Sequence, residues 1–172
     1  ASIAGAGLVT VAVPGSLNSI LESKLTEQLS LALTEEQPGI LSDMGLAEIK
    51  EKIDWCHVFL AGPGYGRDEK NLAVLAQSID YALHKQKKII IDADGLFLLA
   101  SDKKLLARLD NNCVITPHHG EFLRLNEAAK DLIEDQPWRA LGNFVEQYAF
   151  VTNLKGAPSL TEQKGRGLFI NT

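Results

Sequence analysis

The sequence has 172 residues, 45% of them hydrophobic and 23% charged, which is enough apolar material to fill one globular core. A net charge of −5 and the lack of a Lys/Arg-rich run argue against a surface that binds nucleic acid or anionic membranes. No run approaches about 18 apolar residues, so no membrane-spanning helix is expected. Cys56 and Cys113 lie in or beside apolar runs, outside any CxxC pair. They are expected to be reduced core thiols, which fits a cytoplasmic protein.

Short apolar runs alternate with helical patterns along the chain. Strands are expected at 8–13, 58–61, 89–92, 113–116, 151–154 and 168–171, and helices at 17–33, 72–83 and 138–148. Most strand runs are continuously apolar, which is typical of strands that are covered on both faces. The alternation predicts an α/β fold with a mainly parallel sheet between layers of helices. The stretch 34–45 is expected to be a polar surface excursion.

Ligands bind such sheets at the carboxyl ends of the strands, so the residues that follow each strand are the first candidates for a site. After 58–61 comes GPGYGRDEK, with glycines at Gly62, Gly64 and Gly66. Glycines let a backbone approach a ligand closely, and the helix that follows offers free N–H groups. A tight strand-to-helix turn, with Asp68 as the helix cap, explains the same residues equally well. The spacing is not the GxGxxG of dinucleotide-binding folds.

The next strand ends in DADGL. Asp92 and Asp94 are two residues apart, so on an extended strand they would share one face. Such a pair could hold Mg²⁺ through water or fix a polar ligand. Alternatively, Asp94 caps the next helix while Asp92 accepts hydrogen bonds from backbone amides.

The strand at 113–116 ends in TPHHGE. Pro117 stops the strand, and the adjacent histidines would point opposite ways in an extended chain. A zinc site is not expected, because no matching ligand motif is present. One histidine facing a cleft as a hydrogen-bond donor fits better. Glu121 is favourable in the first turn of the helix that follows.

The strand at 151–154 is followed by KGAPSLT. A lysine beside a glycine at a strand end suits a phosphate contact, because it combines a mobile charge with exposed N–H groups. A solvated turn lysine is the alternative for Lys155. The P-loop pattern is absent. Together, these polar and glycine-rich strand ends predict that a phosphorylated ligand binds this edge of the sheet.

Five segments, taken in order, resemble a known family: AGAGLVTVAVP, LAGPGYG, IIIDADGL, VITPHHGEFLRL and NLKGAPSL. They are similar to the ADP/ATP-dependent NAD(P)H-hydrate dehydratases, the nicotinamide-repair enzymes of the ribokinase-like superfamily. The resemblance implies a ribokinase-like, three-layer α/β/α sandwich. It implies an enzyme that phosphorylates the ring hydroxyl of hydrated NADH or NADPH with ADP or ATP and Mg²⁺, and then eliminates phosphate. It also implies a homo-oligomer.

The resemblance assigns residues to two sides of the site. Gly64 would lie near the hydrated nicotinamide nucleotide, Gly62 and Gly66 would shape its loop, and His118 would contact the same ligand. Asp94 is placed on this substrate side, whereas Asp92 receives no role. The adenine-nucleotide side would be formed by Lys155, Gly156, Ala157, Pro158 and Ser159. No residue is assigned as a direct metal ligand.

The resemblance also sets an expectation about the ends of the domain. Family members continue past the FINT strand into a GxGD segment that carries the catalytic aspartate, which would lie beyond Thr172. Residues 1–172 are therefore expected to be a single ribokinase-like domain that lacks its N-terminal helix and this segment, and to be inactive alone. Two alternatives stay open: a ribokinase-like kinase for a sugar or vitamin, and a non-catalytic nucleotide-binding module.

Overall fold

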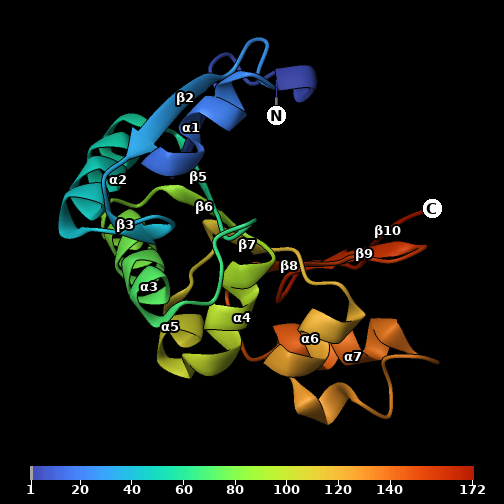
Figure 1. Ribbon diagram of the computed structural model, residues 1–172. Coiled ribbons are helices and arrows are strands. Elements are labelled where there is room, and N and C mark those ends of the chain that lie inside the picture. Colours follow the sequence, from blue (N-terminus) through green and yellow to red (C-terminus); the bar gives the residue numbers. More distant parts are fainter. Residues whose placement is uncertain (1) are drawn as a thin grey trace.

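A computed structural model describes residues 2–172 (Figure 1). The elements are β1 (Thr10–Pro14), α1 (Gly15–Glu22), β2 (Leu29–Leu33), β3 (Glu35–Gln37), β4 (Ile40–Leu41), α2 (Asp43–Trp55), β5 (Val58–Ala61), α3 (Glu69–His84), β6 (Lys88–Ile91), α4 (Asp94–Ser101), α5 (Lys103–Arg108), β7 (Cys113–Ile115), α6 (His119–Leu125), α7 (Pro137–Val145), β8 (Val151–Leu154), β9 (Ser159–Glu162) and β10 (Phe169–Asn171). Short 3₁₀ turns add Ser2–Ala4 and Glu127–Ala129.

The central sheet has six strands in the order β10-β9-β8-β7-β6-β5. The pairings from β5 to β8 are parallel, and β9 and β10 add antiparallel strands at one side. Along the sequence, helices connect each parallel strand to the next, as crossover connections in a parallel sheet require. The predicted α/β class and the mainly parallel sheet are confirmed.

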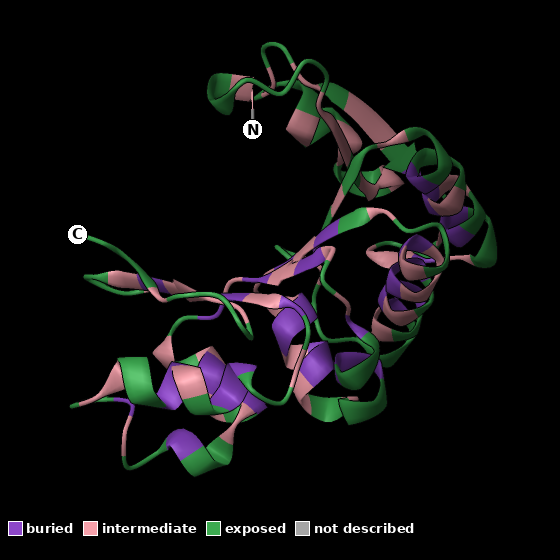
Figure 2. Cartoon of the chain, turned by 180° about the vertical axis from the view of Figure 1, so that it is seen from behind, coloured by how far each residue is buried: buried purple, intermediate pink, exposed green. Residues whose placement is uncertain are grey.

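The core lies between the sheet and the helices on one of its faces. Figure 1 shows α4 to α7 gathered on the same side of the sheet, and Figure 2 shows buried residues on these helices, on the strands, and along α2 and α3. Ile89, Ile91 and Ile115 are fully buried on this face. Because side chains alternate along a strand, their neighbours point to the other face. There Val58 and Leu60 are 47% and 57% exposed.

The N-terminal part is a unit with its own two-stranded sheet, which adjoins the core at Leu33. Strands β1 and β2 pair in parallel with each other, and not with the central sheet. Within residues 2–32 no residue is buried, and Leu33 is the first core residue along the chain. In Figure 1 this unit projects away from helices α4 to α7, at the opposite side of the molecule.

Several predicted elements need correction. The helix expected at 17–33 ends at Glu22, and its second half is strand β2. The stretch 34–45, expected to be a polar surface excursion, contains the β3–β4 hairpin and the start of α2, which were not predicted. Ser42 caps that helix by accepting a hydrogen bond from the N–H of Gly45, at 3.2 Å. Strand β9 was not predicted, since its apolar side chains are few.

The two cysteines are free thiols, as expected. Cys113 is buried, and this burial raises the pKa of its thiol to about 12. Cys56 is only half-buried, and desolvation raises its pKa as well. Thiols with raised pKa values carry little thiolate and are poor nucleophiles.

Candidate functional site

The carboxyl ends of β5, β6, β7 and β8 meet at one edge of the sheet, because these four strands are neighbours and parallel. The pairing of β7 with β8 extends past both strand ends. Lys155 donates its backbone N–H to the carbonyl of Pro117 at 2.7 Å, and His118 forms a parallel bridge with Lys155. The TPHHGE and KGAPS segments, predicted to serve two different ligands, are therefore adjacent.

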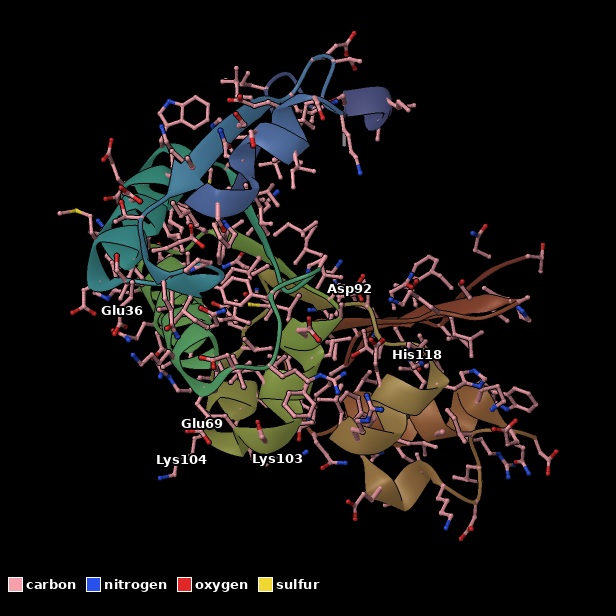
Figure 3. All side chains as sticks on the ribbon, viewed as in Figure 1. Glu36, Glu69, Asp92, Lys103, Lys104 and His118 are labelled. Atoms are coloured by element: carbon pink, nitrogen blue, oxygen red, sulfur yellow. The ribbon has the colours of Figure 1, made fainter. Side chains whose placement is uncertain are left out.

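A lysine and two carboxylates form the polar centre of this edge. The Lys155 ammonium donates to Asp92 Oδ1 at 2.6 Å and lies 3.8 Å from Glu121 Oε2. The side chain of Lys155 is 40% exposed, whereas that of Glu121 is only 12% exposed. The ion pair is thus open to a ligand from one side. Figure 3 labels Asp92 in this central part of the molecule.

The surroundings of Asp92 favour its charged form. Burial raises its pKa, but the hydrogen bond from Lys155, the N–H of Ala93 and the charge of Lys155 outweigh burial. The net effect is that the pKa of Asp92 lies below its ordinary value of 3.8. The centre therefore pairs an ionised carboxylate with a cation at neutral pH, which suits the binding of phosphate or metal ions.

His118 forms the N-terminal cap of α6. Its Nδ1 accepts hydrogen bonds from the N–H groups of Gly120 and Glu121, at 3.0 and 3.4 Å. Glu121 completes a capping box by accepting the N–H of His118 at 2.9 Å. Because Nδ1 is an acceptor, the proton of the neutral ring is assigned to Nε2. Nε2 lies 3.5 Å from Glu121 Oε1, and the imidazole is 56% exposed, so a ligand that accepts this proton would compete with the Glu121 carboxylate.

The three glycines of the glycine loop (Gly62–Gly66) have different roles. Gly62 has φ +119°, and a Cβ there would lie 1.9 Å from the carbonyl oxygen of Asp92. It is therefore required by backbone packing against the β6–α4 turn. Gly64 and Gly66 have φ values of +67° and +79°, and a Cβ on either would meet open space. Their backbone is the part of the loop that a ligand can approach.

The two aspartates of DADGL point to different partners. Asp92 pairs with Lys155, the residue after β8, whereas Asp94 contacts the glycine loop after β5. They do not share a face, because β6 ends at Ile91 and Ala93 adopts φ +50°. Asp94 is the first residue of α4 and not its cap, which is Ala93. The alternative role of Asp92, accepting a backbone N–H, is confirmed by the 2.9 Å bond from Ala93.

Asp68 has the structural role that was set out as an alternative to ligand binding. It caps α3 by accepting the N–H of Lys70 at 2.9 Å. The helix starts at Glu69, directly after this cap, as that alternative implies.

The KGAPS segment is the turn that joins β8 to β9. The Ser159 hydroxyl donates to the carbonyl of Gly156 at 3.0 Å and accepts its N–H at 3.4 Å, which closes the turn. The Ala157–Pro158 peptide bond is cis, and both of these residues are exposed. A Cβ on Gly156 would lie 3.5 Å from Nε2 of His119, so this histidine faces the same turn.

Two functional candidates were not recognised in the sequence. Glu121 was interpreted only as a favourable charge in a first helical turn, yet it contacts both His118 and Lys155. The His-x-x-Glu spacing resembles a capping box and was the available signal. Arg67 was noted only as part of a helix start, whereas its Nε lies 3.3 Å from Asp94.

Among residues 2–172, no group of three or more His, Cys, Asp or Glu side chains is placed to hold a metal ion.

Within the same range, none of the helices combines the length and the apolar character needed to cross a membrane.

Solved structures place the fold in the ribokinase-like class. A ribokinase-like superfamily protein from Enterococcus faecalis aligns with a TM-score of 0.75 and 23% identity, over 98% of this chain and 54% of that one. An ADP/ATP-dependent NAD(P)H-hydrate dehydratase from Bacillus subtilis, co-crystallised with ATP and Mg²⁺, aligns with a TM-score of 0.68 and 17% identity, over 97% of this chain and 54% of that one. At these identities the similarity concerns the fold alone.

The sequence identifies the family within this class. The chain belongs to the NAD(P)H-hydrate dehydratase family, whose carbohydrate-kinase-like family model matches residues 1–172. A bifunctional NAD(P)H-hydrate repair enzyme from Moorella thermoacetica is 32% identical over 168 residues, which are 98% of this chain and 31% of that protein. The chain thus spans about a third of the length of this relative.

Proposed function

We propose that this chain contributes the substrate and nucleotide sites of an enzyme that dehydrates NAD(P)H hydrate, using ADP or ATP. The observation that carries the proposal is the meeting of the glycine loop, His118 and the Lys155–Asp92 pair at one edge of a parallel sheet. Membership of the NAD(P)H-hydrate dehydratase family supports this substrate. We also propose which residues recognise the hydrated dinucleotide.

The substrate side consists of the glycine loop and His118. Gly64 would present open backbone to the hydrated nicotinamide nucleotide, Gly66 would shape the loop through its N–H bond to Asp94, and His118 would donate from Nε2. Gly62 supports the loop by packing on the β6–α4 turn, and Asp94 contacts the loop from α4. Positioning of this kind is the main requirement for phosphoryl transfer.

The nucleotide side is the turn Lys155-Gly156-Ala157-Pro158-Ser159. Lys155 supplies the positive charge, and the exposed backbone beside it can accommodate phosphate oxygens. Its 2.6 Å contact with Asp92 holds the ammonium at the sheet edge before a nucleotide binds. Lys155 would then stabilise negative charge on the transferred group.

Asp92 is the carboxylate that would hold a magnesium ion together with phosphate oxygens and water, because its side chain is 30% exposed. Glu121 is only 12% exposed and already accepts the N–H of His118. Proteins usually bind Mg²⁺ through one or two carboxylates together with phosphate oxygens and water. When bound, the ion would neutralise charge on the nucleotide phosphates.

The reaction has two steps. The terminal phosphoryl group moves from the nucleotide to the ring hydroxyl oxygen, which loses its proton. The carbon–oxygen bond then breaks, a proton leaves the neighbouring ring carbon, and the ring double bond and inorganic phosphate form. The catalytic residue is not assigned among residues 1–172.

We propose that residues 1–172 belong to one ribokinase-like domain, in a cytoplasmic homo-oligomer. The net charge of −5 supports the absence of nucleic-acid partners.

Phosphorus NMR distinguishes this function from that of a small-molecule kinase on the same fold. The full-length protein is incubated with hydrated NADH, Mg²⁺ and either ADP or ATP. Dehydration predicts that inorganic phosphate appears in step with loss of the nucleotide's terminal phosphate. A stable phosphate ester, without inorganic phosphate, would indicate a kinase and contradict the proposal.

A further inference from the structure

The glycine loop is fixed at its first residue. A Cβ on Gly62 would lie 1.9 Å from the Asp92 carbonyl oxygen and 2.7 Å from the N atom of Gly95. The packing is reciprocal, because a Cβ on Gly95 would lie 3.3 Å from the Cα of Gly62. The backbone at the start of the loop therefore lies directly against the start of α4.

The far end of the loop is held by a side chain. Asp94 Oδ2 accepts the N–H of Gly66 at 3.0 Å, and Oδ1 lies 3.3 Å from Nε of Arg67. The Arg67 guanidinium in turn lies over the ring of Phe97, 4.5 Å from its centroid. Both Asp94 oxygens therefore have partners in or beside the loop, and the Asp94 side chain is only 22% exposed.

Between these two attachments the backbone at Gly64 is open. Gly64 is exposed, and a Cβ added to it would meet no atom within 4 Å. Tyr65 donates its N–H to the Gly62 carbonyl at 3.1 Å and packs against the core, so the turn itself is closed. The open backbone is thus carried on a loop that is fixed at both ends.

We propose that Asp94 is a positioning residue, which acts on the dinucleotide through the glycine loop and not by direct contact. With Arg67 and Phe97 it forms a clamp that keeps the Gly64–Gly66 backbone in the shape the ligand needs. This inference rests on the proposed function for the identity of the ligand. Preorganised loops lose less conformational entropy on binding, so loosening the clamp weakens binding.

The test compares Asp94→Ala and Asp94→Asn in the full-length protein. Alanine removes both contacts, whereas asparagine keeps one oxygen that can accept the Gly66 N–H. Hydrogen exchange, measured without any ligand, should be at least about tenfold faster at the Gly66 amide in Asp94→Ala, with Asp94→Asn in between. Asp68→Ala is the matched control, since Asp68 is a nearby carboxylate that caps α3 and does not contact Gly66.

Kinetics give the second measurement. Asp94→Ala should raise KM for the hydrate about tenfold while kcat stays within about threefold, with partial rescue by Asp94→Asn. Unchanged exchange at Gly66 in Asp94→Ala would overturn the inference, and a raised KM would then indicate direct contact with the ligand. The exchange experiment needs no turnover. An inactive wild-type enzyme would therefore count against the proposed function, while faster exchange in Asp94→Ala would still support the clamp.

Discussion

Lys155 and Asp92 come from different strands, yet they form the closest charged contact of the site, at 2.6 Å. Both side chains are partly exposed, at 40% and 30%, so the pair contributes little to stability. The ion pair serves to orient Lys155, because it holds the ammonium group at the edge of the sheet where the ligand is proposed to bind.

The pKa of Asp92 tests this pairing. The pKa of Asp92 is lower in the folded chain than in the unfolded chain. The ionised Asp92 therefore stabilises the fold above about pH 4, and this stabilisation is lost as the pH falls through the pKa that Asp92 has in the folded chain. Lys155→Met should raise the pKa of Asp92, measured by NMR titration of its carboxyl carbon. Lys164→Met, which changes a surface lysine paired with Glu146, should leave it unchanged. If Asp92 had the same pKa in the wild type, in Lys155→Met and in Lys164→Met, the pairing of Asp92 with Lys155 would be ruled out.

Ala93 is a site of backbone strain. It joins β6 to α4 at φ +50° and ψ −120°, a conformation that non-glycine residues rarely adopt. Ala93→Gly should therefore raise the free energy of unfolding by about 1 kcal/mol, measured by chemical denaturation. Ala76→Gly, in the middle of α3, should lower it by about 1 kcal/mol. If both substitutions lowered the free energy of unfolding, the backbone at Ala93 would not be strained.

At the scale of single residues, the sequence identified the positions after each strand but not their contacts. Gly62, Asp92 and Lys155 were singled out because glycine, carboxylate and lysine at strand ends are suited to ligand binding. Their partners come from distant parts of the chain, as in the 63-residue separation between Asp92 and Lys155. Spacing in the sequence does not report such contacts, which is why the contact of Glu121 with Lys155 and that of Arg67 with Asp94 were missed.

His118 has two roles: it caps the N-terminus of helix α6, and it is proposed to contact the ligand. His118→Ala should lower the free energy of unfolding by about 1 kcal/mol, because it removes the cap, whereas His118→Ser keeps a capping oxygen. Both should weaken binding of the hydrated dinucleotide, since neither offers Nε2–H. Chemical denaturation and calorimetry measure the two effects. If His118→Ser bound the ligand as tightly as wild type, the imidazole would have no ligand role.

Elements with strong periodic or continuous apolar patterns were predicted well. Strand β5 was predicted with its observed bounds, and the apolar face of α3 was recognised. Strand β2 was mistaken for helix, because its LSLAL sequence is short and follows helical spacing from α1. Strand β9 was missed, since pairing with β8 and not its own composition makes SLTE a strand.

The whole molecule is asymmetric. Helices cover one face of the central sheet, and the opposite face carries Leu60 and Phe169 at 57% and 68% exposure. Continuously apolar strands predicted coverage on both faces. Within residues 2–172 only one face is covered, since the other leaves Val58, Leu60 and Phe169 exposed.

Recovery of absorbance at 340 nm tests the central claim most directly. The full-length protein is incubated with hydrated NADH, Mg²⁺ and either ADP or ATP, because only the restored dihydronicotinamide absorbs there. We predict recovery that requires a nucleotide and that falls at least about tenfold in Lys155→Met but not in Lys164→Met. No recovery with either nucleotide, from a folded protein that still binds it, would contradict the proposed dehydratase.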